Sequence, residues 1–402
     1  MREIDCIVIG AGPAGLAAAL ASARAGRSTA VLEKMDRPGR KLLITGGGRC
    51  NLCDPARDPL DALRAFGRGG EFLRNALARF SLAEFLADLD VHTELDASDS
   101  RHYVVGGARR LLGALLTSAT AAGACLRPRS RVRSLEPLPS AGWRVGCSEA
   151  VFESRRVILA TGGLTYPSTG SSGDGYDWAE RLGHEVVPPT PTLGALATKP
   201  NFAALAGVTV PAVEFTLTVR KRKAGRLRGT LLFTHRGVSG PAVLDLSLEM
   251  TRASGGNETA ELTIDFLPDV PREKLESSIA SSAGRKLSRA LGATPLPSRL
   301  VAEVIRRAGL DPDARVEHVS RKDLRALVDR VKSTRLAVIG VEDPERCTVT
   351  FGGVSTREID PRTMESRLVP GLYFAGEIIS VHGPCGGYNL LQAFSTGHSA
   401  GS

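Results

Sequence analysis

The run Ile4-Asp5-Cys6-Ile7-Val8-Ile9 leads directly into Gly10-Ala11-Gly12-Pro13-Ala14-Gly15, and this stretch decides the fold. The first six residues are mostly apolar and rich in β-branched side chains, which predicts a buried parallel strand. The small residues at 16–25 predict a helix, which Gly26 would end. Strand, G-x-G-x-x-G and helix in this order form a dinucleotide-binding fingerprint, so the sequence predicts a Rossmann-type α/β domain.

The small residues of the fingerprint have distinct predicted tasks. Gly10 would make the tight turn, Gly12 would let the backbone approach a pyrophosphate, and Gly15 would let the helix pack close to the strand. The phosphates would lie at the helix N-terminus, beside Pro13 and Ala14, where free N–H groups and the helix dipole favour anions. We therefore expect all five residues to contact the cofactor.

An acid follows the second predicted strand at the distance that the fingerprint requires. Residues 28–32 predict this strand, and Glu33 comes 18 residues after Gly15. An acid here accepts ribose hydroxyls and disfavours a 2′-phosphate, so FAD or NAD fits better than NADP. The alternative is an ordinary strand–turn–helix with chance glycines, which the combination of strand, helix and acid disfavours.

Length and composition set limits on the class of protein. The 402 residues are enough for two or three domains. A composition of 42% hydrophobic and 24% charged residues is typical of soluble globular chains. No apolar run approaches the roughly 20 residues of a membrane span. Acidic residues interrupt the N-terminal segment, and the seven cysteines lack a disulfide-scaffold spacing. We therefore expect no signal peptide and a cytoplasmic protein with reduced thiols.

The net charge of +9 is compatible with a polyanionic partner and equally with solvated surface arginines. Six of the nine residues at 220–228 are Lys or Arg, and Ala224-Gly225 is the expected turn of a basic hairpin. Six phosphate contacts would make RNA binding strongly salt-dependent. A solvated hairpin is the alternative, and the scarcity of aromatic residues argues against stacking of single-stranded bases.

Two glycine-rich segments lie further along the chain. Gly46-Gly47-Gly48-Arg49-Cys50-Asn51 predicts a loop that passes close to a flat ligand. Arg40, Lys41 and Arg49 are possible contacts for phosphates or a flavin carbonyl. Short strands at 132–135, 143–147 and 150–153 predict an antiparallel meander. A third buried strand at 155–160 then ends in Thr161-Gly162-Gly163.

The meander followed by Thr161-Gly162-Gly163 resembles the second glycine motif of FAD folds of the glutathione-reductase type. Gly371-Leu372-Tyr373-Phe374-Ala375-Gly376-Glu377 resembles their late motif, in which the terminal Gly and acid contact the ribityl and phosphate part of the flavin. The two motifs flank a long insert, so the resemblance implies a discontinuous FAD-binding domain.

The resemblance becomes more specific with four further stretches, Gly46 to Asn51, Ser168-Thr169-Gly170-Ser171-Ser172-Gly173-Asp174-Gly175-Tyr176, Phe233-Thr234-His235-Arg236-Gly237-Val238-Ser239-Gly240-Pro241 and Gly386-Gly387-Tyr388-Asn389. In this order they resemble the BaiN-like, or aminoacetone-oxidase-like, FAD-dependent flavoproteins over essentially the whole chain. Membership implies an FAD-binding Rossmann-type domain at 1–187 and 346–402, an inserted β-barrel-like domain at 188–266 and 332–345, and a helical subdomain at 267–331.

The motifs and the resemblance predict a second set of cofactor-binding residues besides the fingerprint. These are Glu33, Lys34, Arg40, Lys41, Gly48, Arg49, Cys50, Asn51, Val132, Thr161, Gly162, Gly163, Asp174, Gly376, Glu377, Gly386, Gly387, Tyr388 and Asn389. A helix at 389–397 would point its N-terminus at the N1/O2 edge of the flavin, where a positive dipole end stabilises the reduced anion.

Catalysis would be hydride transfer at flavin N5, to or from a substrate bound between the FAD domain and the insert. His235 is the first acid–base candidate, because it titrates near neutrality and lies between a strand and a Gly-rich turn that starts a helix. Its closeness in sequence to the basic hairpin would let that hairpin present RNA to the flavin. Tyr388 and His382, on the C-terminal flavin loop, are the next candidates. A structural or solvated His235 is the alternative.

The redox partner is left open by the sequence. Cys50 and Cys53 have C-x-x-C spacing, but no second pyridine-nucleotide domain accompanies them, which disfavours a disulfide relay. No second C-x-x-C or histidine pair completes a metal site. NAD(P)H would have to reduce the flavin by transient binding over the ring; otherwise the substrate reduces FAD and oxygen reoxidises it.

Family membership implies several possible activities, among them amine oxidation, reduction of enones in steroid-like acids and reduction of uridine in ribosomal RNA. An FAD-dependent oxidoreductase is the main hypothesis. A flavin-dependent dihydrouridine synthase acting on ribosomal RNA and a non-catalytic flavin-binding redox sensor are the alternatives. Arg101-His102-Tyr103-Val104-Val105 lacks the proline of the Arg-x-Phe/Tyr-Pro stretch usual in relatives, so the motifs alone transfer no relative's substrate.

Overall fold

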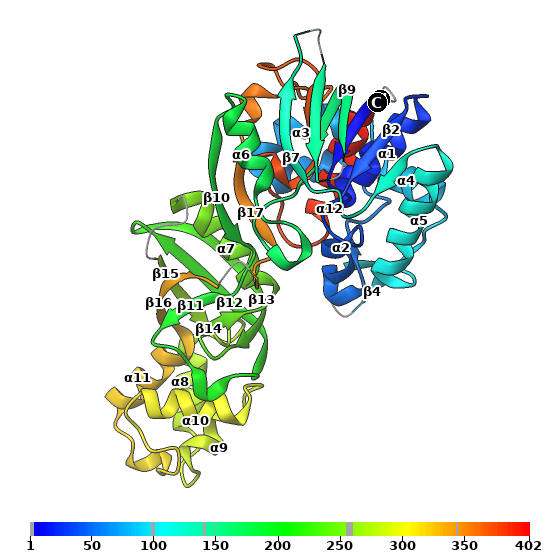
Figure 1. Cartoon of the computed structure of the whole chain (residues 1–402). Helices are drawn as coiled ribbons and strands as arrows, with labels where there is room; N and C mark the ends of the chain where they lie inside the picture. The colour runs from blue at the N-terminus through cyan, green and yellow to red at the C-terminus, as the bar shows by residue number, and fades with distance from the viewer. Residues whose placement is uncertain (1–3, 98–100, 140–141, 149, 255–259, 343–344) are drawn as a thin grey trace. The chain divides into compact units, whose positions relative to one another are not determined.

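The computed structural model describes residues 4–97, 101–139, 142–148, 150–254, 260–342 and 345–402. The chain divides into two compact units (Figure 1). Unit 1 comprises Met1–Pro191 with Thr348–Ser402, and unit 2 comprises Thr192–Cys347. The sequence predicts the breaks after 187 and before 346, with separate barrel-like and helical parts between them.

Unit 1 is built on a seven-stranded sheet with the order β6-β2-β1-β9-β8-β7, in which β18 pairs with β9. The strands are β1 (Ile4–Ile9), β2 (Thr29–Leu32), β6 (Cys125–Arg127), β7 (Val132–Pro137), β8 (Trp143–Cys147), β9 (Val151–Leu159) and β18 (Leu372–Phe374). Strands β2, β9 and their neighbours β6 and β18 run parallel to β1, which is the strand order of a Rossmann-type fold and confirms the predicted fold class.

Strand β9 is continuous, so the prediction of separate strands at 150–153 and 155–160 is wrong. Its first half pairs antiparallel with β8, and its second half pairs parallel with β1 and β18. Ser154 does not interrupt the strand, because its hydroxyl bonds to the backbone carbonyl of Arg156 while the chain stays extended. The meander is therefore a direct extension of the Rossmann sheet.

Two helices from opposite ends of the chain pack on each other beside this sheet, α1 (Pro13–Arg24) and α12 (Tyr388–Gly401) (Figure 1). A Cβ atom on Gly397 would lie 2.3 Å from the Ala14 carbonyl oxygen, and one on Gly401 would lie 2.2 Å from that of Ala18. The two helices therefore touch backbone to backbone, and the small residues on both are what permits it.

The remaining elements of unit 1 surround the sheet. They are α2 (Arg40–Ile44), η1 (Thr45–Gly48), β3 (Asn51–Leu52), η2 (Pro59–Gly69), α3 (Gly70–Ala78), α4 (Leu82–Asp88), β4 (Thr93–Asp96), β5 (Arg101–Val104), α5 (Gly107–Ala121), η3 (Pro167–Thr169), α6 (Asp174–Arg181), β10 (Val186–Thr192), β17 (Val349–Val354), η6 (Thr356–Glu358) and η7 (Gly376–Ile378). Strands β3, β5 and β4 form a small antiparallel sheet, and β10 pairs with β17.

Unit 2 is a closed six-stranded barrel with one cluster of helices. The barrel strands are β11 (Leu196–Lys199), β14 (Gly237–Ser239), β13 (Arg222–Phe233), β12 (Thr209–Val219), β15 (Ala260–Asp265) and β16 (Thr334–Val341), in that order around the barrel. The helical elements are η4 (Ala203–Leu205), α7 (Pro241–Ser254), α8 (Arg272–Ala280), α9 (Leu287–Leu291), α10 (Ser298–Arg307), η5 (Val316–His318) and α11 (Arg321–Lys332).

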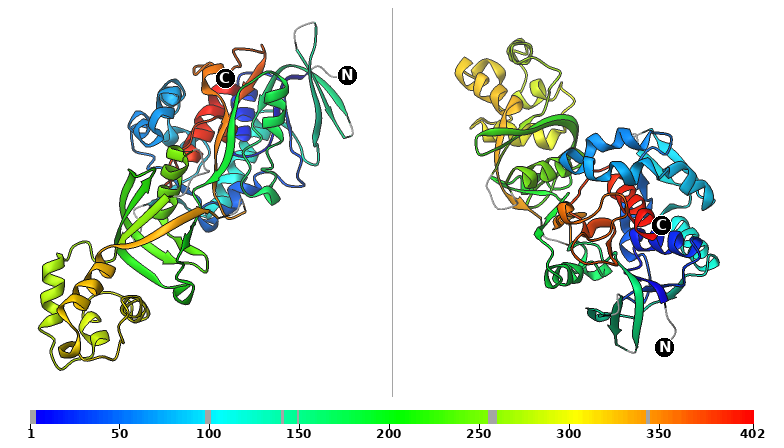
Figure 2. Two further views of the ribbon diagram at one scale, coloured as in Figure 1. Left: turned by 90° about the vertical axis from the view of Figure 1, so that its left-hand side faces the viewer. Right: turned by 90° about the horizontal axis from the view of Figure 1, so that it is seen from above.

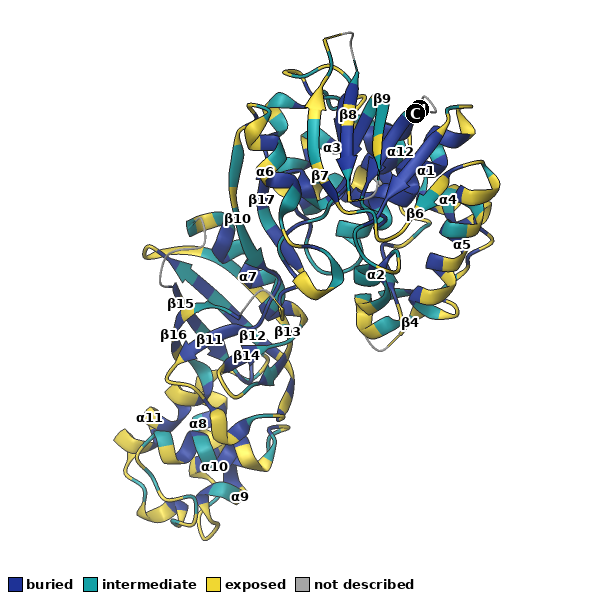
Figure 3. Cartoon of the chain, in the orientation of Figure 1, coloured by how far each residue is buried: buried dark blue, intermediate teal, exposed yellow. Residues whose placement is uncertain are grey.

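The views of Figures 1 and 2 agree that helices α8–α11 lie at one end of the barrel. Figure 3 shows the buried residues inside the barrel continuing into these helices. One hydrophobic core contains Phe215 and Leu262 from the barrel together with Leu300 and Leu327 from the helices. Among the described helices of the whole chain, none is long and apolar enough to cross a bilayer.

The basic hairpin is formed by β12 and β13, but its turn lies elsewhere than predicted. Val219 pairs with Arg222, so Arg220 and Lys221 are the two turn residues, with φ of +50° and +60°. A two-residue turn with both φ values positive matches the right-handed twist of the strands. The predicted turn at Ala224-Gly225 is therefore wrong, and these residues lie within β13.

A buried histidine ties two loops of unit 1 to β18. His184 Nδ1 lies 3.1 Å from Glu358 Oε2, and its Nε2 lies 2.9 Å from Ser366 Oγ. The ring also makes an edge contact with Phe374 at the end of β18. Burial lowers the pKa of His184 from its usual value near 6.5, and Glu358 offsets only part of this effect.

We predict that acidification destabilises unit 1 through His184. Because the pKa is lower in the folded state, the unfolded chain takes up the proton first, and stability present above pH 6.5 is lost as the pH falls toward the folded-state value. His184→Gln should reduce the unfolding free energy by about 1–3 kcal/mol near neutral pH, because it leaves buried groups without partners. Urea unfolding across this pH range should show a shallower pH dependence for the variant, although His398 also contributes. Equal slopes would contradict the prediction.

Candidate functional site

The fingerprint turn places the N-terminus of α1 at the end of β1. Gly10 has φ of +104°, and a Cβ atom there would lie 2.5 Å from the Ala160 carbonyl oxygen. A Cβ on Gly15 would lie 1.9 Å from the Gly10 carbonyl oxygen, so the helix is in backbone contact with the turn. Gly12, the N-cap, has no side-chain cap and no atom within 4 Å of its Cβ position. The structure itself therefore requires Gly10 and Gly15, whereas the space at Gly12 is open for a ligand.

Glu33 lies at the end of β2, beside this turn. Its Oε2 accepts a hydrogen bond from the Ala11 N–H and its Oε1 accepts one from the Met35 N–H, both at 2.8 Å. The residue is 9% exposed, so the carboxylate is held in one position. Each oxygen retains acceptor capacity for a further donor, such as a ribose hydroxyl.

Lys34 and Asp174, both predicted as cofactor contacts, bind each other. Lys34 Nζ lies 3.0 Å from Asp174 Oδ2 and also bonds to Ser172, and the Arg131 guanidinium lies 3.3 Å from the same carboxylate. Burial opposes ionisation of Asp174, but the hydrogen bonds from Ser172 and Lys34 outweigh it, so the pKa of Asp174 is lowered. The carboxylate is therefore a fixed negative charge among cations.

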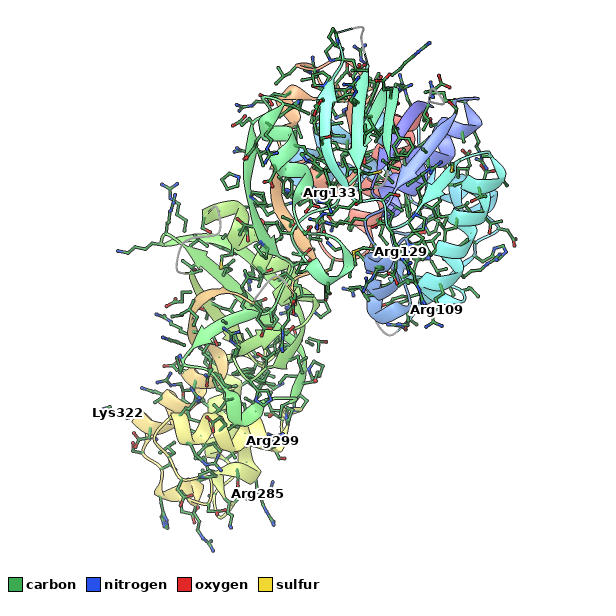
Figure 4. All side chains as sticks on the ribbon, viewed as in Figure 1. Arg109, Arg129, Arg133, Arg285, Arg299 and Lys322 are labelled. Atoms are coloured by element: carbon green, nitrogen blue, oxygen red, sulfur yellow. The ribbon has the colours of Figure 1, made fainter. Side chains whose placement is uncertain are left out.

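An open cavity of about 350 Å³ adjoins Asp174. It is lined by Arg131, Val132, Arg133, Asp174, Asp177, Trp178 and Arg181. In Figure 4, Arg133 and Arg129 lie near the β7 side of unit 1. Three arginines and an indole can receive an anionic or aromatic group, and Val132 and Asp174 are the two lining residues that the sequence predicts as cofactor contacts.

A second fixed ion pair joins the first glycine loop region to the late motif. Lys41 Nζ lies 2.7 Å from Glu377 Oε2 and 2.7 Å from Thr165 Oγ1. Glu377 Oε1 accepts the Thr350 N–H at 2.7 Å. A Cβ on Gly163 would lie 2.2 Å from Thr350 Oγ1, so the second glycine motif is packed against this cluster.

Buried hydroxyls near these clusters have no hydrogen-bond partner in the described part of the chain. They are Thr161 Oγ1 and the Tyr176 hydroxyl, and burial raises the pKa of Tyr176 well above its usual value. Gly376, whose Cβ would lie 2.6 Å from Ala14 Cβ, lies against α1. The open space at Gly12 and the unpartnered Thr161 hydroxyl fit a group bound along this edge of the sheet.

In the Gly46–Asn51 loop, the glycines are available to a ligand, whereas the arginine is engaged by its own chain. Gly46, Gly47 and Gly48 all have positive φ, and the loop is half-buried to exposed. The Arg49 guanidinium lies 3.7 Å from the Tyr103 ring centroid and 2.7 Å from Asp96 Oδ2. The predicted phosphate contact by Arg49 thus competes with two groups of its own chain.

Cys50 and Cys53 are both buried and free. Burial raises the pKa of Cys50 to about 11 and that of Cys53 to about 12. The thiolate is the reactive form of cysteine, so neither thiol has the character of a redox nucleophile at neutral pH. Within the described residues, no group of three His, Cys, Asp or Glu side chains could hold a metal ion.

The C-terminal loop closes against the first glycine loop. A Cβ on Gly387 would lie 2.2 Å from the Cys53 backbone nitrogen, and Gly387 is the N-cap of α12. The Asn389 amide clamps the loop, donating to the Gly383 carbonyl at 2.8 Å and accepting its N–H at 3.0 Å. Tyr388 begins α12, and its hydroxyl accepts a hydrogen bond from Arg57 Nη1 at 2.9 Å.

The three acid–base candidates lie in different settings. His382 is 5% exposed, and its Nε2 accepts the Gly352 N–H at 2.9 Å, which places the ring proton on Nδ1. Tyr388 is half-buried. His235 lies in unit 2, exposed between β13 and β14, and residues 237–239 form a strand rather than the predicted turn.

The structure therefore brings together predicted residues from distant segments, most clearly Lys41 with Glu377 and Lys34 with Asp174. Arg40 pairs instead with Asp36, at 3.7 Å. Sequence patterns missed the residues that complete these clusters, namely Arg57, Arg131, Thr165, Ser172 and Thr350. Ser172 lies within the quoted Ser168–Tyr176 stretch, whereas the other four are isolated polar residues that no spacing signal marks.

We predict opposite outcomes for alanine at two fingerprint glycines. Gly15→Ala should destabilise the protein itself, because its Cβ would overlap the Gly10 carbonyl oxygen. Gly12→Ala should leave the melting temperature of the ligand-free protein unchanged and lower the bound flavin content, since its Cβ enters only the open space. Absorbance of the purified proteins and thermal melting of their apo forms measure the two effects. Full flavin content in a folded Gly12→Val variant would contradict this placement of the cofactor.

Comparison with known proteins places the chain among flavoenzymes. The family model described as HI0933-like protein Rossmann domain matches residues 4–402. The chain is 33% identical over 408 residues to a ribosomal RNA dihydrouridine synthase of Escherichia coli (strain K12), covering 98% of this chain and 96% of that protein. It is 31% identical over 401 residues to a protein of the same name from Haemophilus influenzae (strain ATCC 51907 / DSM 11121 / KW20 / Rd), with 98% and 96% covered.

A third relative bears a different name. The 3-dehydro-bile acid delta(4,6)-reductase of Clostridium scindens (strain ATCC 35704 / DSM 5676 / VPI 13733 / 19) is 31% identical over 410 residues, covering 98% of this chain and 97% of that protein. Among solved structures, a 3-ketosteroid-delta4-(5alpha)-dehydrogenase from Rhodococcus jostii RHA1 has a TM-score of 0.51 at 17% identity, with 100% and 97% covered, which shows likeness of fold alone. The chain belongs to the HI0933-like Rossmann family and is, as its motifs predict, a BaiN-like FAD-dependent oxidoreductase.

Proposed function

We propose that this oxidoreductase reduces uridine in ribosomal RNA to dihydrouridine, adding hydrogen across the C5=C6 bond that is conjugated with the C4 carbonyl. The observation that carries the proposal is the match over 98% of the chain to two relatives named for this activity, at 33% and 31% identity. The bile-acid relative is also named as a reductase. Reduction of a carbon–carbon double bond in a conjugated carbonyl compound would be the chemistry common to all three.

The cofactor site proposed for FAD follows one edge of unit 1. The N-terminus of α1 would receive the pyrophosphate, Glu33 the ribose, and the segment beside Thr161 and Glu377 the ribityl chain. When bound, FAD supplies hydride transfer. The sequence contains one G-x-G-x-x-G fingerprint opening a helix, so we further propose that NAD(P)H reduces the flavin by transient binding without a Rossmann domain of its own.

Reduction of a double bond also needs a proton, and we propose the Tyr388 hydroxyl as its donor. The hydroxyl is at the start of α12 and accepts a hydrogen bond from the Arg57 guanidinium at 2.9 Å. A cation on the phenol oxygen stabilises the phenolate that proton donation leaves behind. His382 is less suited, because its Nε2 is occupied by the Gly352 N–H. Its proposed task is to position the loop before α12.

A cytoplasmic location would suit this function. Cys50, Cys53 and the exposed Cys125 are free thiols, and free exposed thiols are usual where the compartment is reducing. A ribosomal RNA substrate would be found in the same compartment.

We predict that the purified holoenzyme with NADPH converts uridine to dihydrouridine in transcripts of ribosomal RNA. Nuclease digestion and mass spectrometry would detect the added pair of hydrogens. RNA from a strain lacking the gene serves as the natural substrate, and heat-inactivated enzyme is the control. An enzyme that is reduced by NADPH, leaves every RNA unchanged and reduces a conjugated steroid ketone would contradict this proposal. That result would identify a small-molecule reductase.

Tyr388→Phe should separate the two half-reactions. We expect reduction of the substrate to slow by about 10²–10⁴-fold, the usual contribution of a general acid. Reduction of FAD by NADPH should keep its rate, because that step needs no proton from Tyr388. Stopped-flow absorbance of the two half-reactions measures both, with His235→Ala as the matched comparison on unit 2. A substrate half-reaction that is unchanged in Tyr388→Phe and slowed in His235→Ala would assign the proton to His235.

A further inference from the structure

The β12–β13 hairpin tip of unit 2 carries a concentrated positive charge that no described residue neutralises. We propose that this tip, consisting of Lys221, Arg222 and Lys223, is an anchor that binds the phosphate backbone of folded RNA. The proposal rests on the proposed function for the identity of its partner. It adds to that function a surface outside the cofactor site.

The charge of the protein is distributed unevenly between its two units. Unit 2 contains 25 Lys and Arg residues against 18 Asp and Glu, so +7 of the net charge of +9 belongs to it. Unit 1, which holds the cofactor fingerprint, is close to neutral. A polyanion is therefore attracted to unit 2 first.

Two of the six cations of the hairpin form ion pairs with carboxylates of unit 2. Arg226 lies 2.6 Å from Glu214, and Arg228 lies 3.2 Å from Glu214 and 2.8 Å from Asp269. These two arginines are therefore neutralised by carboxylates of their own unit. The sequence could not show this, because all six cations look alike in the run 220–228.

The three tip cations have no such partner. Lys221, Arg222 and Lys223 are all exposed, and none forms an ion pair with any residue that the structure describes. They are consecutive, at and just after a two-residue turn, so their side chains can spread over neighbouring phosphates of one strand or across a groove. Three cations in three residues would be repulsive without a counter-charge.

The turn holds its cations in a backbone conformation that other residues adopt more easily. Arg220 and Lys221 have φ of +50° and +60°, where Asn or Gly is preferred. A residue other than glycine in this left-handed conformation costs of order 1 kcal/mol or more of folding free energy, and such residues cluster at functional sites. The conformation turns the backbone sharply at the tip and exposes Lys221 at its outermost point.

The composition of the tip identifies the part of RNA that it would contact. Residues 220–228 contain no aromatic side chain on which an unpaired base could stack. Lysine and arginine on a narrow hairpin suit phosphates, which position an RNA without reading its sequence. We therefore infer binding to paired or folded RNA rather than to an extended single strand.

Other cations of unit 2 are less concentrated. Figure 4 labels Arg285, Arg299 and Lys322, which are spread over the helical end. Arg299 already donates to the Ala204 carbonyl. The hairpin tip belongs to the opposite end of the barrel, because Val219 pairs with Ala260, whereas α8 follows the other end of β15.

The position of His235 shows that the tip is separate from that acid–base candidate. β13 runs from Arg222 to Phe233, and 11 steps of about 3.3 Å give about 36 Å along the strand. The hairpin's presentation of RNA to the flavin stays a prediction, and the tip itself lies far along the strand from His235. The tip acts as an anchor at a distance from this residue.

The test replaces all three tip cations in the full-length holoenzyme by K221A, R222A and K223A together. The control triple is R79A, R109A and R357A, which removes the same charge from exposed positions of unit 1. The probe is a folded transcript of ribosomal RNA, with binding measured over a range of salt concentrations. We expect the tip variant to bind about tenfold or more weakly, and the slope of log affinity against log salt to fall by about 3, one for each lost phosphate contact.

The outcomes separate this surface from the proposed function. Unchanged affinity and slope in the tip variant, or an equal loss in the control triple, would overturn the anchor whatever the enzyme does to uridine. Tip-dependent RNA binding by a wild-type enzyme that forms no dihydrouridine would support the anchor and refute the proposed substrate. Thermal melting and the rate of FAD reduction by NADPH should be the same in both variants and the wild type, so a lost fold cannot mimic the effect.

Discussion

The backbone contacts of helix α1 are the constraint on which unit 1 depends. On one side, Gly15 meets the carbonyl of Gly10, which fixes the helix against the end of β1. On the other side, Gly397 and Gly401 of α12 meet the carbonyls of α1. Because interiors are close-packed, a single methyl group at these positions would displace a whole helix. These glycines thus set how closely the first and last segments of the chain approach each other.

Charged side chains make a second set of connections over long sequence distances. Lys41 and Glu377 form a short, partly buried pair at 2.7 Å, and Lys34 and Asp174 form another at 3.0 Å. Such pairs contribute little net stability when desolvation is taken into account, but breaking one leaves a charge without its partner. Their value lies in holding loops in position along the cofactor edge before any ligand arrives.

The sequence predicted the elements that depend on local patterns. Buried strand β1, the glycine turn and α1 follow from apolar periodicity and residue size, and the family could be identified because its motifs are short and local. What the sequence could not predict depends on partners from elsewhere. The continuity of β9 follows from its pairing with β1 on one side and with β8 and then β18 on the other. Thr165 and Thr350 gain their partners only when the fold brings Lys41 and Glu377 together.

The basic hairpin is a second example of a feature that the sequence alone could not predict. Counting charges along the sequence gives six, and composition points to Ala224-Gly225 as the turn. Strand pairing moves the turn to Arg220 and Lys221, and in this register Phe215 and Leu217 of β12 are buried inside the barrel. The register that buries the core therefore also decides which cations reach solvent, so packing inside the barrel determines the charge that the surface offers to a partner.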